Sequence, residues 1–232
     1  MKIRLTEESW RKAYRIVSSR FPPVGVFDRV ADPDDLEAVY YVESLTNPRL
    51  REEMGQIALV AREDRIAGPG TAPIMAAFTH LNPSGSRFTN GEYGVYYAAN
   101  SQQTAIAETV FHVARLAEES SDPPTSFVMR VYIGRLNKRP YHDLRGKAAQ
   151  FPEWFDPDPR RYGPAQALGA QLREAGSWGI LYDSVRDAKG QCVAAFRPPA
   201  LGVVHQAAHL AYCWDGKTIT DVVELRSLGL PG

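Results

Sequence analysis

The sequence lacks several features that would place it in a common class of protein. It has only two cysteines, Cys192 and Cys213, with neither CxxC spacing nor a signal peptide nearby, so we predict two reduced core residues in a cytoplasmic protein. No apolar run approaches the roughly 20 residues that span a membrane. Lysine plus arginine equals aspartate plus glutamate at 27 each, so no net charge favours nucleic acid or an anionic membrane. We therefore expect neither as a direct partner.

Common nucleotide-binding and catalytic motifs are also missing. The glycines form neither GxxxxGK[ST] nor a GxGxxG after a strand, so any NAD bound here would be a consumed substrate and not a Rossmann-bound hydride carrier. Ser184 stands in YDSVR and not in G-x-S-x-G, which counts against an α/β-hydrolase. Glu108 and His112 have the spacing of two metal ligands on a helix, but no third ligand follows at a recognisable distance. We therefore expect no metal.

The composition is that of an ordinary globular protein. Of 232 residues, 44% are hydrophobic and 23% are charged, and no linker divides the chain, so one domain is predicted. Apolar periodicity and turn residues predict alternating elements. Strands are expected over 14–17, 57–60, 94–99, 126–134, 139–144, 179–185, 192–196, 203–214 and 217–225. Helices are expected over 6–12, 32–45, 72–81, 102–117 and 162–175.

One stretch, from Gly85 to Glu108 (GSRFTNGEYGVYYAANSQQTAIAE), combines an arginine, a tyrosine pair and a carboxylate in a strand followed by a helix. Asn100 and Ser101 supply side-chain oxygens that can cap this helix. Glu108 does not share the apolar stripe of the helix, and an exposed carboxylate alone needs no functional explanation. Glu108 is a candidate catalytic residue because the same stretch places Arg87 on the preceding loop and Tyr97 on the strand.

These motifs resemble the RES-domain toxins of bacterial toxin-antitoxin pairs, a family named for an arginine, a glutamate and a serine. The likeness rests on YRIV around Arg15, GSRFTNG around Arg87, VYYAANSQQTAIAE ending in Glu108, and GILYDSVRDAKGQCVAAFRP around Ser184. It covers most of the chain, and a RES domain is expected over 1–232 with a helical insertion at about 32–56. The resemblance implies an α+β fold of one domain, with the split β-sheet of ADP-ribosyltransferases and flanking helices.

The resemblance also implies a reaction that breaks NAD at the nicotinamide N-glycosidic bond, by phosphorolysis or hydrolysis. Arg15 and Arg87 would bind the phosphates or the ribose, and Tyr97 would stack on the nicotinamide. Glu108 would hydrogen-bond the ribose hydroxyl and face the developing cation, and Ser184 would orient the nicotinamide side or a ribose hydroxyl. NAD would be a substrate, with inorganic phosphate or water as acceptor. A cognate helix-turn-helix (Xre-like) antitoxin is implied as a partner, and a homodimer stays open.

Some assignments have competitors. Arg20 competes with Arg15, because a long insertion separates the N-terminal motif from the next arginine motif. Relatives often carry a second serine early in the helix at 162–175, where this chain has none, so Gln166 and Tyr162 compete with Ser184.

Two other functions remain open. In the first, the same site transfers ADP-ribose to a protein. In the second, the chain is a binding module without catalytic activity. The proline-rich loop at 148–159 carries aromatic residues that either cover a bound ring or pack down the loop.

Overall fold

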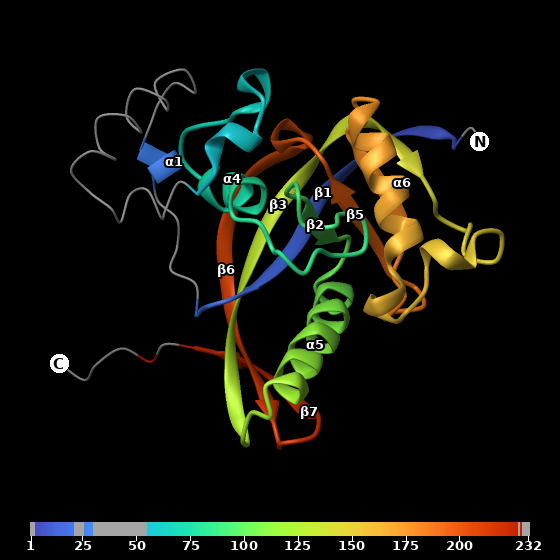
Figure 1. Ribbon diagram of the computed structural model, residues 1–232. Helices are drawn as coiled ribbons and strands as arrows, with labels where there is room; N and C mark the ends of the chain where they lie inside the picture. The colour runs from blue at the N-terminus through green and yellow to red at the C-terminus, as the bar shows by residue number, and fades with distance from the viewer. Residues whose placement is uncertain (1–2, 21–25, 30–54, 227, 229–232) are drawn as a thin grey trace.

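The computed structural model describes residues 3–20, 26–29, 55–226 and 228 of the chain. Short 3-10 helices occur at 57–59, 62–64, 152–154, 159–161 and 198–200. Element labels follow Figure 1. The strands and longer helices are, in chain order, β1 (Leu5–Ser18), α1 (Val26–Arg29), α4 (Ala72–Thr79), β2 (Tyr96–Ala99), α5 (Gln102–Glu119), β3 (Thr125–Asp143), α6 (Gly163–Glu174), β4 (Gly179–Asp183), β5 (Gln191–Ala195), β6 (Leu201–Trp214) and β7 (Ile219–Leu225).

The seven strands form one sheet that is split into a long part and a short part. Their order is β1-β2-β5-β4-β3-β6-β7, and β1 pairs in addition with β3, so that five strands close a ring. Two junctions in the ring are weak, with one residue pair between β1 and β2 and two pairs between β3 and β4. The long part is therefore β1-β3-β6-β7 and the short part is β2-β5-β4. This single-domain α+β fold with flanking helices confirms the predicted fold class.

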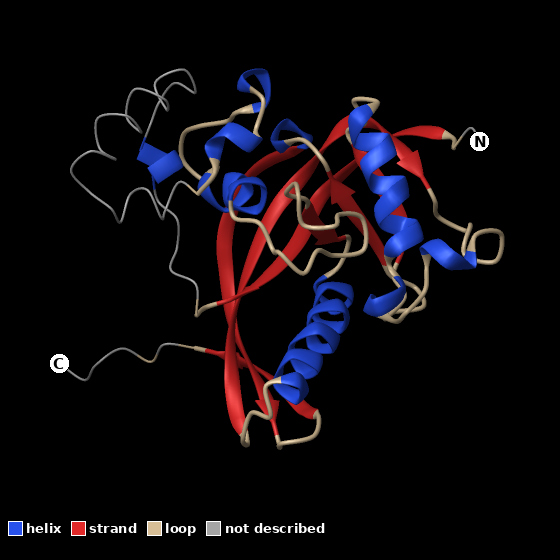
Figure 2. Ribbon diagram, in the orientation of Figure 1, coloured by secondary structure: helices blue, strands red, loops and turns tan. Residues whose placement is uncertain are grey.

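Two buried cores lie on opposite faces of the sheet. Along β5, Val193 and Ala195 belong to the first core, whereas Cys192 and Ala194 belong to the second. The first core includes the buried apolar residues of α4, and the second includes Ala105 of α5 and the buried leucines of α6. Figure 2 shows α5 and α6 as the two long helices beside the strands. Both cysteines are free, as predicted. Cys192 is buried in the second core, whereas Cys213 is only partly buried and belongs to neither core.

Two predicted elements are wrong. Residues 6–12 form no helix but the first half of β1, whose pairing with β3 runs from Leu5 to Ser18. Residues 57–60 form no strand, because the 3-10 helix Ile57–Leu59 replaces it and buries Ile57. The predicted strand at 139–144 is not separate but is the end of the long β3. The predicted insertion at 32–56 lies outside the described residues except for 55 and 56.

The predicted helix at 32–45 lies outside the described residues, and the predicted strands at 14–17 and 126–134 form parts of the longer β1 and β3. The remaining predicted helices and strands are confirmed within a few residues of their bounds. None of the described helices combines the length and hydrophobicity that crossing a membrane requires.

The packing of α6 against Phe88 generates a stability prediction. A Cβ atom on Gly169 would lie 2.1 Å from the main-chain oxygen of Phe88, whereas one on Gly163 of the same helix would meet nothing within 4 Å. We predict that Gly169→Ala lowers the free energy of unfolding by roughly 1–3 kcal/mol, because the backbone must shift to admit the methyl group. Urea denaturation measures this, with Gly163→Ala as the control. Equal stability of the two variants would contradict the prediction.

Candidate active site

The short part of the sheet brings Glu108 and Ser184 to the same edge. Both β2 and β4 run antiparallel to β5, so the C-terminal ends of β2 and β4 point the same way. The chain enters α5 from the end of β2, and Ser184 directly follows β4. The helix that carries the carboxylate and the turn that carries the serine therefore begin side by side.

Ser184 donates a hydrogen bond to Glu108. The distance from Ser184 Oγ to Glu108 Oε1 is 2.6 Å, and the serine is only 8% exposed. The same Oγ accepts the backbone N–H groups of Arg186 (3.1 Å) and Asp187 (3.0 Å). Because two donors occupy the oxygen, the single hydroxyl proton is directed to the carboxylate. The serine therefore orients Glu108, and this geometry does not activate it as a nucleophile.

The first turn of α5 is fixed by the predicted cap. Ser101 Oγ accepts the backbone N–H of Thr104 at 3.1 Å. This bond satisfies one of the N–H groups that a helix start leaves unpaired. Glu108 lies farther along the helix and is partly buried, with Cys192 Sγ 4.0 Å from Oε1. Glu108 is therefore not a fully solvated surface residue.

Tyr97 lies on β2 and faces the second core. Its hydroxyl oxygen accepts hydrogen bonds from Ser86 Oγ (2.8 Å) and from the backbone N–H of Phe88 (3.0 Å). Burial raises the pKa of the Tyr97 hydroxyl well above its ordinary value, so the group stays protonated at neutral pH. Its proton has no acceptor among the residues that the structure describes. The hydroxyl is therefore able to donate to a bound ligand.

Arg87 is buried beneath the segment 152–162 and is 6% exposed. Its Nη1 donates to the main-chain oxygens of Trp154 (3.1 Å) and Asp156 (2.9 Å), and Nη2 donates to the hydroxyl of Tyr162 (3.2 Å). The guanidinium also stacks on the Tyr162 ring, with Cζ 4.4 Å from the ring centroid. Three of the five N–H donors are thus used, and two have no partner within the described part of the chain.

Tyr182 lies on β4 beside the segment that carries Arg87. It is 5% exposed, and its ring packs edge to face on that of Phe88, with centroids 5.1 Å apart. Burial raises the pKa of the Tyr182 hydroxyl well above its ordinary value. The sequence reasoning missed Tyr182. Its position two residues before Ser184 on a strand, and so on the same side, is the signal that points to it.

Arg15 does not join this cluster. On β1, Tyr14 and Ile16 belong to the second core, whereas the Arg15 guanidinium lies over the ring of Tyr96, a residue of the first core, at 4.7 Å. Burial lowers the pKa of Arg15. Its Nη1 donates to the main-chain oxygen of Tyr97 at 3.2 Å, so it reaches the cluster only through the backbone of β2.

The three competing candidates lie in different places. Arg20 is exposed, beyond the end of β1. Gln166 Nε2 donates to the main-chain oxygen of Ser86 at 3.1 Å, and Tyr162 supports Arg87. Gln166 and Tyr162 therefore act on the segment around Arg87, and of Ser184 and its two competitors only Ser184 hydrogen-bonds to Glu108.

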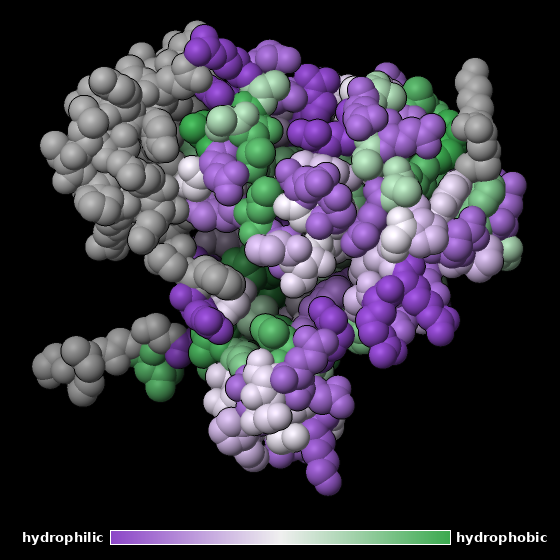
Figure 3. Space-filling view, in the orientation of Figure 1, coloured by the Kyte–Doolittle hydropathy of each residue, from purple (hydrophilic) through white to green (hydrophobic). Residues whose placement is uncertain are grey.

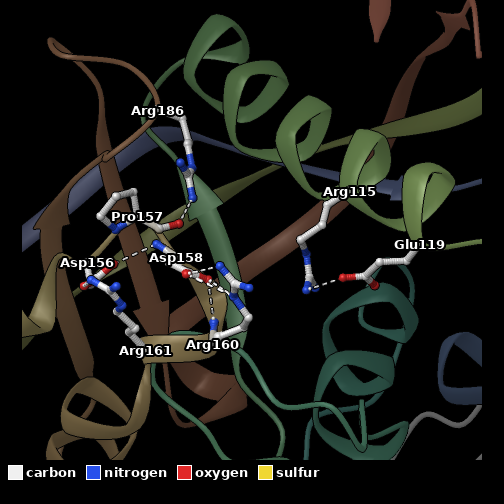
Figure 4. A network of polar contacts seen from close by, with 8 residues as sticks. All are labelled: Arg115, Glu119, Asp156, Pro157, Asp158, Arg160, Arg161 and Arg186. Atoms are coloured by element: carbon white, nitrogen blue, oxygen red, sulfur yellow. Dashed lines mark hydrogen bonds and ion pairs between the residues drawn. The ribbon is translucent and has the colours of Figure 1, made fainter. Parts of the chain in front are cut away.

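The segment that covers Arg87 is also tied to the serine turn. Arg186 donates through Nη2 to the main-chain oxygen of Pro157 and lies over the Phe111 ring of α5 at 3.3 Å. Figure 4 shows Arg186 reaching Pro157 next to the Asp158 and Arg160 pair, whose closest atoms are 2.7 Å apart. One arginine thus connects the serine turn, α5 and the covering segment.

The aromatic residues of the predicted loop pack against the protein. Phe155 is buried in the second core, and Phe151 stacks on Trp154 with ring centroids 4.3 Å apart. Figure 3 shows a recess on this face between α5 and the segment that leads into β2. A cavity of about 630 Å³ lies elsewhere, beside the start of β1 and α6, and does not include Glu108. No group of three or more potential metal ligands occurs within the described ranges.

Comparison with known proteins identifies the family of this chain. The fold and the site define an α+β protein with a split sheet and a partly buried serine–carboxylate pair. Residues 62–215 match the family model described as the RES domain, which is more than half of the chain. The chain therefore belongs to the RES-domain family.

Two similar proteins illustrate the relationship. The uncharacterized protein y4oC of Sinorhizobium fredii (strain NBRC 101917 / NGR234) is 31% identical over 207 residues, which cover 89% of this chain and 84% of that protein. The crystal structure of the M. tuberculosis MbcT-MbcA toxin-antitoxin complex contains a chain that is 16% identical, with a TM-score of 0.45 and coverage of 88% of this chain and 86% of that one.

The hydroxyl of Tyr97 generates the second prediction. In Tyr97→Phe the N–H of Phe88, a fully buried residue, loses its acceptor, so we expect the free energy of unfolding to fall by about 1–3 kcal/mol. Tyr14→Phe is the control, because the Tyr14 hydroxyl makes no hydrogen bond to any described residue although its ring packs on the same core. Urea denaturation compares the two variants. A Tyr97→Phe protein as stable as Tyr14→Phe would show that the hydroxyl does not hold the 86–88 segment.

Proposed function

We propose that this protein cleaves NAD between nicotinamide and ribose and serves as the toxin of a toxin-antitoxin pair. The observation that carries the proposal is the 2.6 Å hydrogen bond from Ser184 to Glu108 in a chain of the RES-domain family. The unused donors of Tyr97 and Arg87 are available to a bound dinucleotide. NAD is the substrate in this proposal and is not retained.

The proposed chemistry requires a carboxylate that faces the ribose. When the glycosidic bond breaks, its electron pair leaves with neutral nicotinamide, and positive charge develops on the ribose ring. An oriented carboxylate stabilises that charge in the transition state. Glu108 fits this task because Ser184 fixes Oε1, whereas Oε2 has no hydrogen-bond partner among the described residues and is able to accept a ribose hydroxyl.

Arg87 and Tyr97 are proposed to hold the substrate. The two remaining N–H donors of Arg87 suit phosphate oxygens, since a guanidinium presents parallel donors in one plane. The fixed ring and neutral hydroxyl of Tyr97 suit stacking on nicotinamide and donation to it. We assign Arg15 no direct substrate contact, because it lies over Tyr96 on the other face of the sheet.

The acceptor completes the reaction. An oxygen of inorganic phosphate or of water forms the new bond to the ribose carbon, and capture of water also releases one proton. The family resemblance further supports a cognate helix-turn-helix antitoxin as the partner of this chain, and we include that partner in the proposal.

Substitution of the carboxylate tests the proposal. We expect Glu108→Gln to lower the rate of nicotinamide release on the order of 100- to 1,000-fold, because the neutral amide no longer stabilises the ribosyl cation. Glu118→Gln is the control, since it removes the same charge from an exposed position on the same helix. Chromatography of NAD incubated with each protein, with and without phosphate, measures the products.

The products also separate the related functions. A phosphorylated ADP-ribose indicates phosphorolysis, and plain ADP-ribose indicates hydrolysis. Label from adenine-tagged NAD on a macromolecule would instead indicate protein ADP-ribosylation. Nicotinamide release at the wild-type rate by Glu108→Gln would overturn the role of the carboxylate. The absence of any NAD turnover, with growth effects unchanged by Glu108→Gln and Arg87→Ala, would favour a binding module.

A further inference from the structure

The turn that carries Ser184 is joined to α5 by a second contact, away from Glu108. Thr104 lies in the first turn of α5 and is 1% exposed. Its Oγ1 donates a 2.7 Å hydrogen bond to Asp187 Oδ2. A further 2.7 Å contact joins Thr104 Oγ1 to Ser101 Oγ, and Ser101 must be the donor there because the threonine proton goes to the carboxylate. A chain of hydroxyl groups thus runs from the helix cap to Asp187.

Asp187 connects this chain directly to the serine. Its side chain accepts the Thr104 proton, and its backbone N–H donates to Ser184 Oγ at 3.0 Å. The turn is closed by two bonds of 2.9 Å, from Gly190 N to the Asp187 main-chain oxygen and from Ser184 N to the Gly190 oxygen. Any displacement of Asp187 therefore moves a group that holds the serine hydroxyl.

The contact leaves no room for the turn to move toward the helix. A Cβ atom on Gly190 would lie 2.3 Å from Thr104 Cγ2 and 2.8 Å from Asp187 Oδ2, closer than non-bonded atoms approach. The turn is thus packed against Thr104 on one side and hydrogen-bonded to it through Asp187.

We propose that Thr104 and Asp187 are positioning residues that set the Ser184 hydroxyl against the Glu108 carboxylate. The inference rests on the proposed function, because it assigns these two residues to the same reaction. Loss of the Thr104 hydroxyl lets the turn move away from α5, and a shift of about 1 Å lengthens the serine–carboxylate hydrogen bond beyond its useful range. The carboxylate then faces the ribose without a fixed orientation.

A matched pair of variants at Thr104 tests this role. Thr104→Val keeps the shape of the side chain and removes the hydroxyl, whereas Thr104→Ser keeps the hydroxyl. We expect kcat for nicotinamide release to fall about 10- to 100-fold in Thr104→Val, with KM changed less than about twofold, and to be restored in Thr104→Ser. Lys189→Ala controls for changes elsewhere in the turn, since Lys189 is exposed.

A double-mutant cycle separates positioning from simple destabilisation. If Thr104 acts through the serine, Thr104→Val has no further effect on kcat in a Ser184→Ala protein. If it acts independently, the two losses multiply, and that result overturns the inference. Hydrogen exchange tests the same role without an activity measurement. The backbone N–H groups of Arg186 and Asp187 donate to Ser184 Oγ, so we expect Thr104→Val to speed their exchange.

The outcomes distinguish the two proposals. A wild-type protein that releases no nicotinamide overturns the proposed function, and unchanged exchange at Arg186 and Asp187 in Thr104→Val then also overturns the positioning role. An active wild-type protein with an equally active Thr104→Val variant overturns the positioning role alone. A selective loss of kcat that Thr104→Ser restores, together with faster exchange, supports it.

Discussion

The hydrogen bond from Ser184 to Glu108 joins residues that are 76 positions apart, and the rest of the site depends on it. It forms because β2 and β4 are both antiparallel to β5, so the helix after one and the turn after the other leave the same edge of the short sheet. Around it, Arg87 anchors the covering segment from below and Arg186 ties that segment to the turn. The site is therefore a junction of α5, the serine turn and the covering segment.

Much of the fold could be predicted from local pattern, and the failures have a common cause. The strand-to-helix unit around Ser101, the β4–β5 hairpin and α6 all carry turn, cap and periodicity signals within a few residues. Residues 6–12 carry helix-forming residues and no strand signal. They nevertheless form a strand, because they pair with β3. That partner lies more than 100 residues away, and a single sequence does not indicate it.

The candidate site could also be predicted only in part, because local motifs are visible in the sequence and non-local contacts are not. Motifs located Glu108 and Ser184. The face of the sheet on which Arg15 lies depends on strand register, because successive side chains of a strand point to opposite faces. The partners of Arg87 are main-chain oxygens, and these have no residue type to recognise. Thr104 resembles any polar residue in a first helical turn until the fold brings Asp187 beside it.

The closed ring of strands has a consequence for how the protein is made. Leu5 pairs with His142, and β2 pairs with β5, whose last residue is Ala195. Synthesis proceeds from the N-terminus, so a nascent chain on the ribosome holds Glu108 long before the strand that completes the short sheet has emerged. Non-local pairing of this kind also folds slowly. The short sheet that brings Ser184 to Glu108 therefore assembles only after the chain has been synthesised as far as β5.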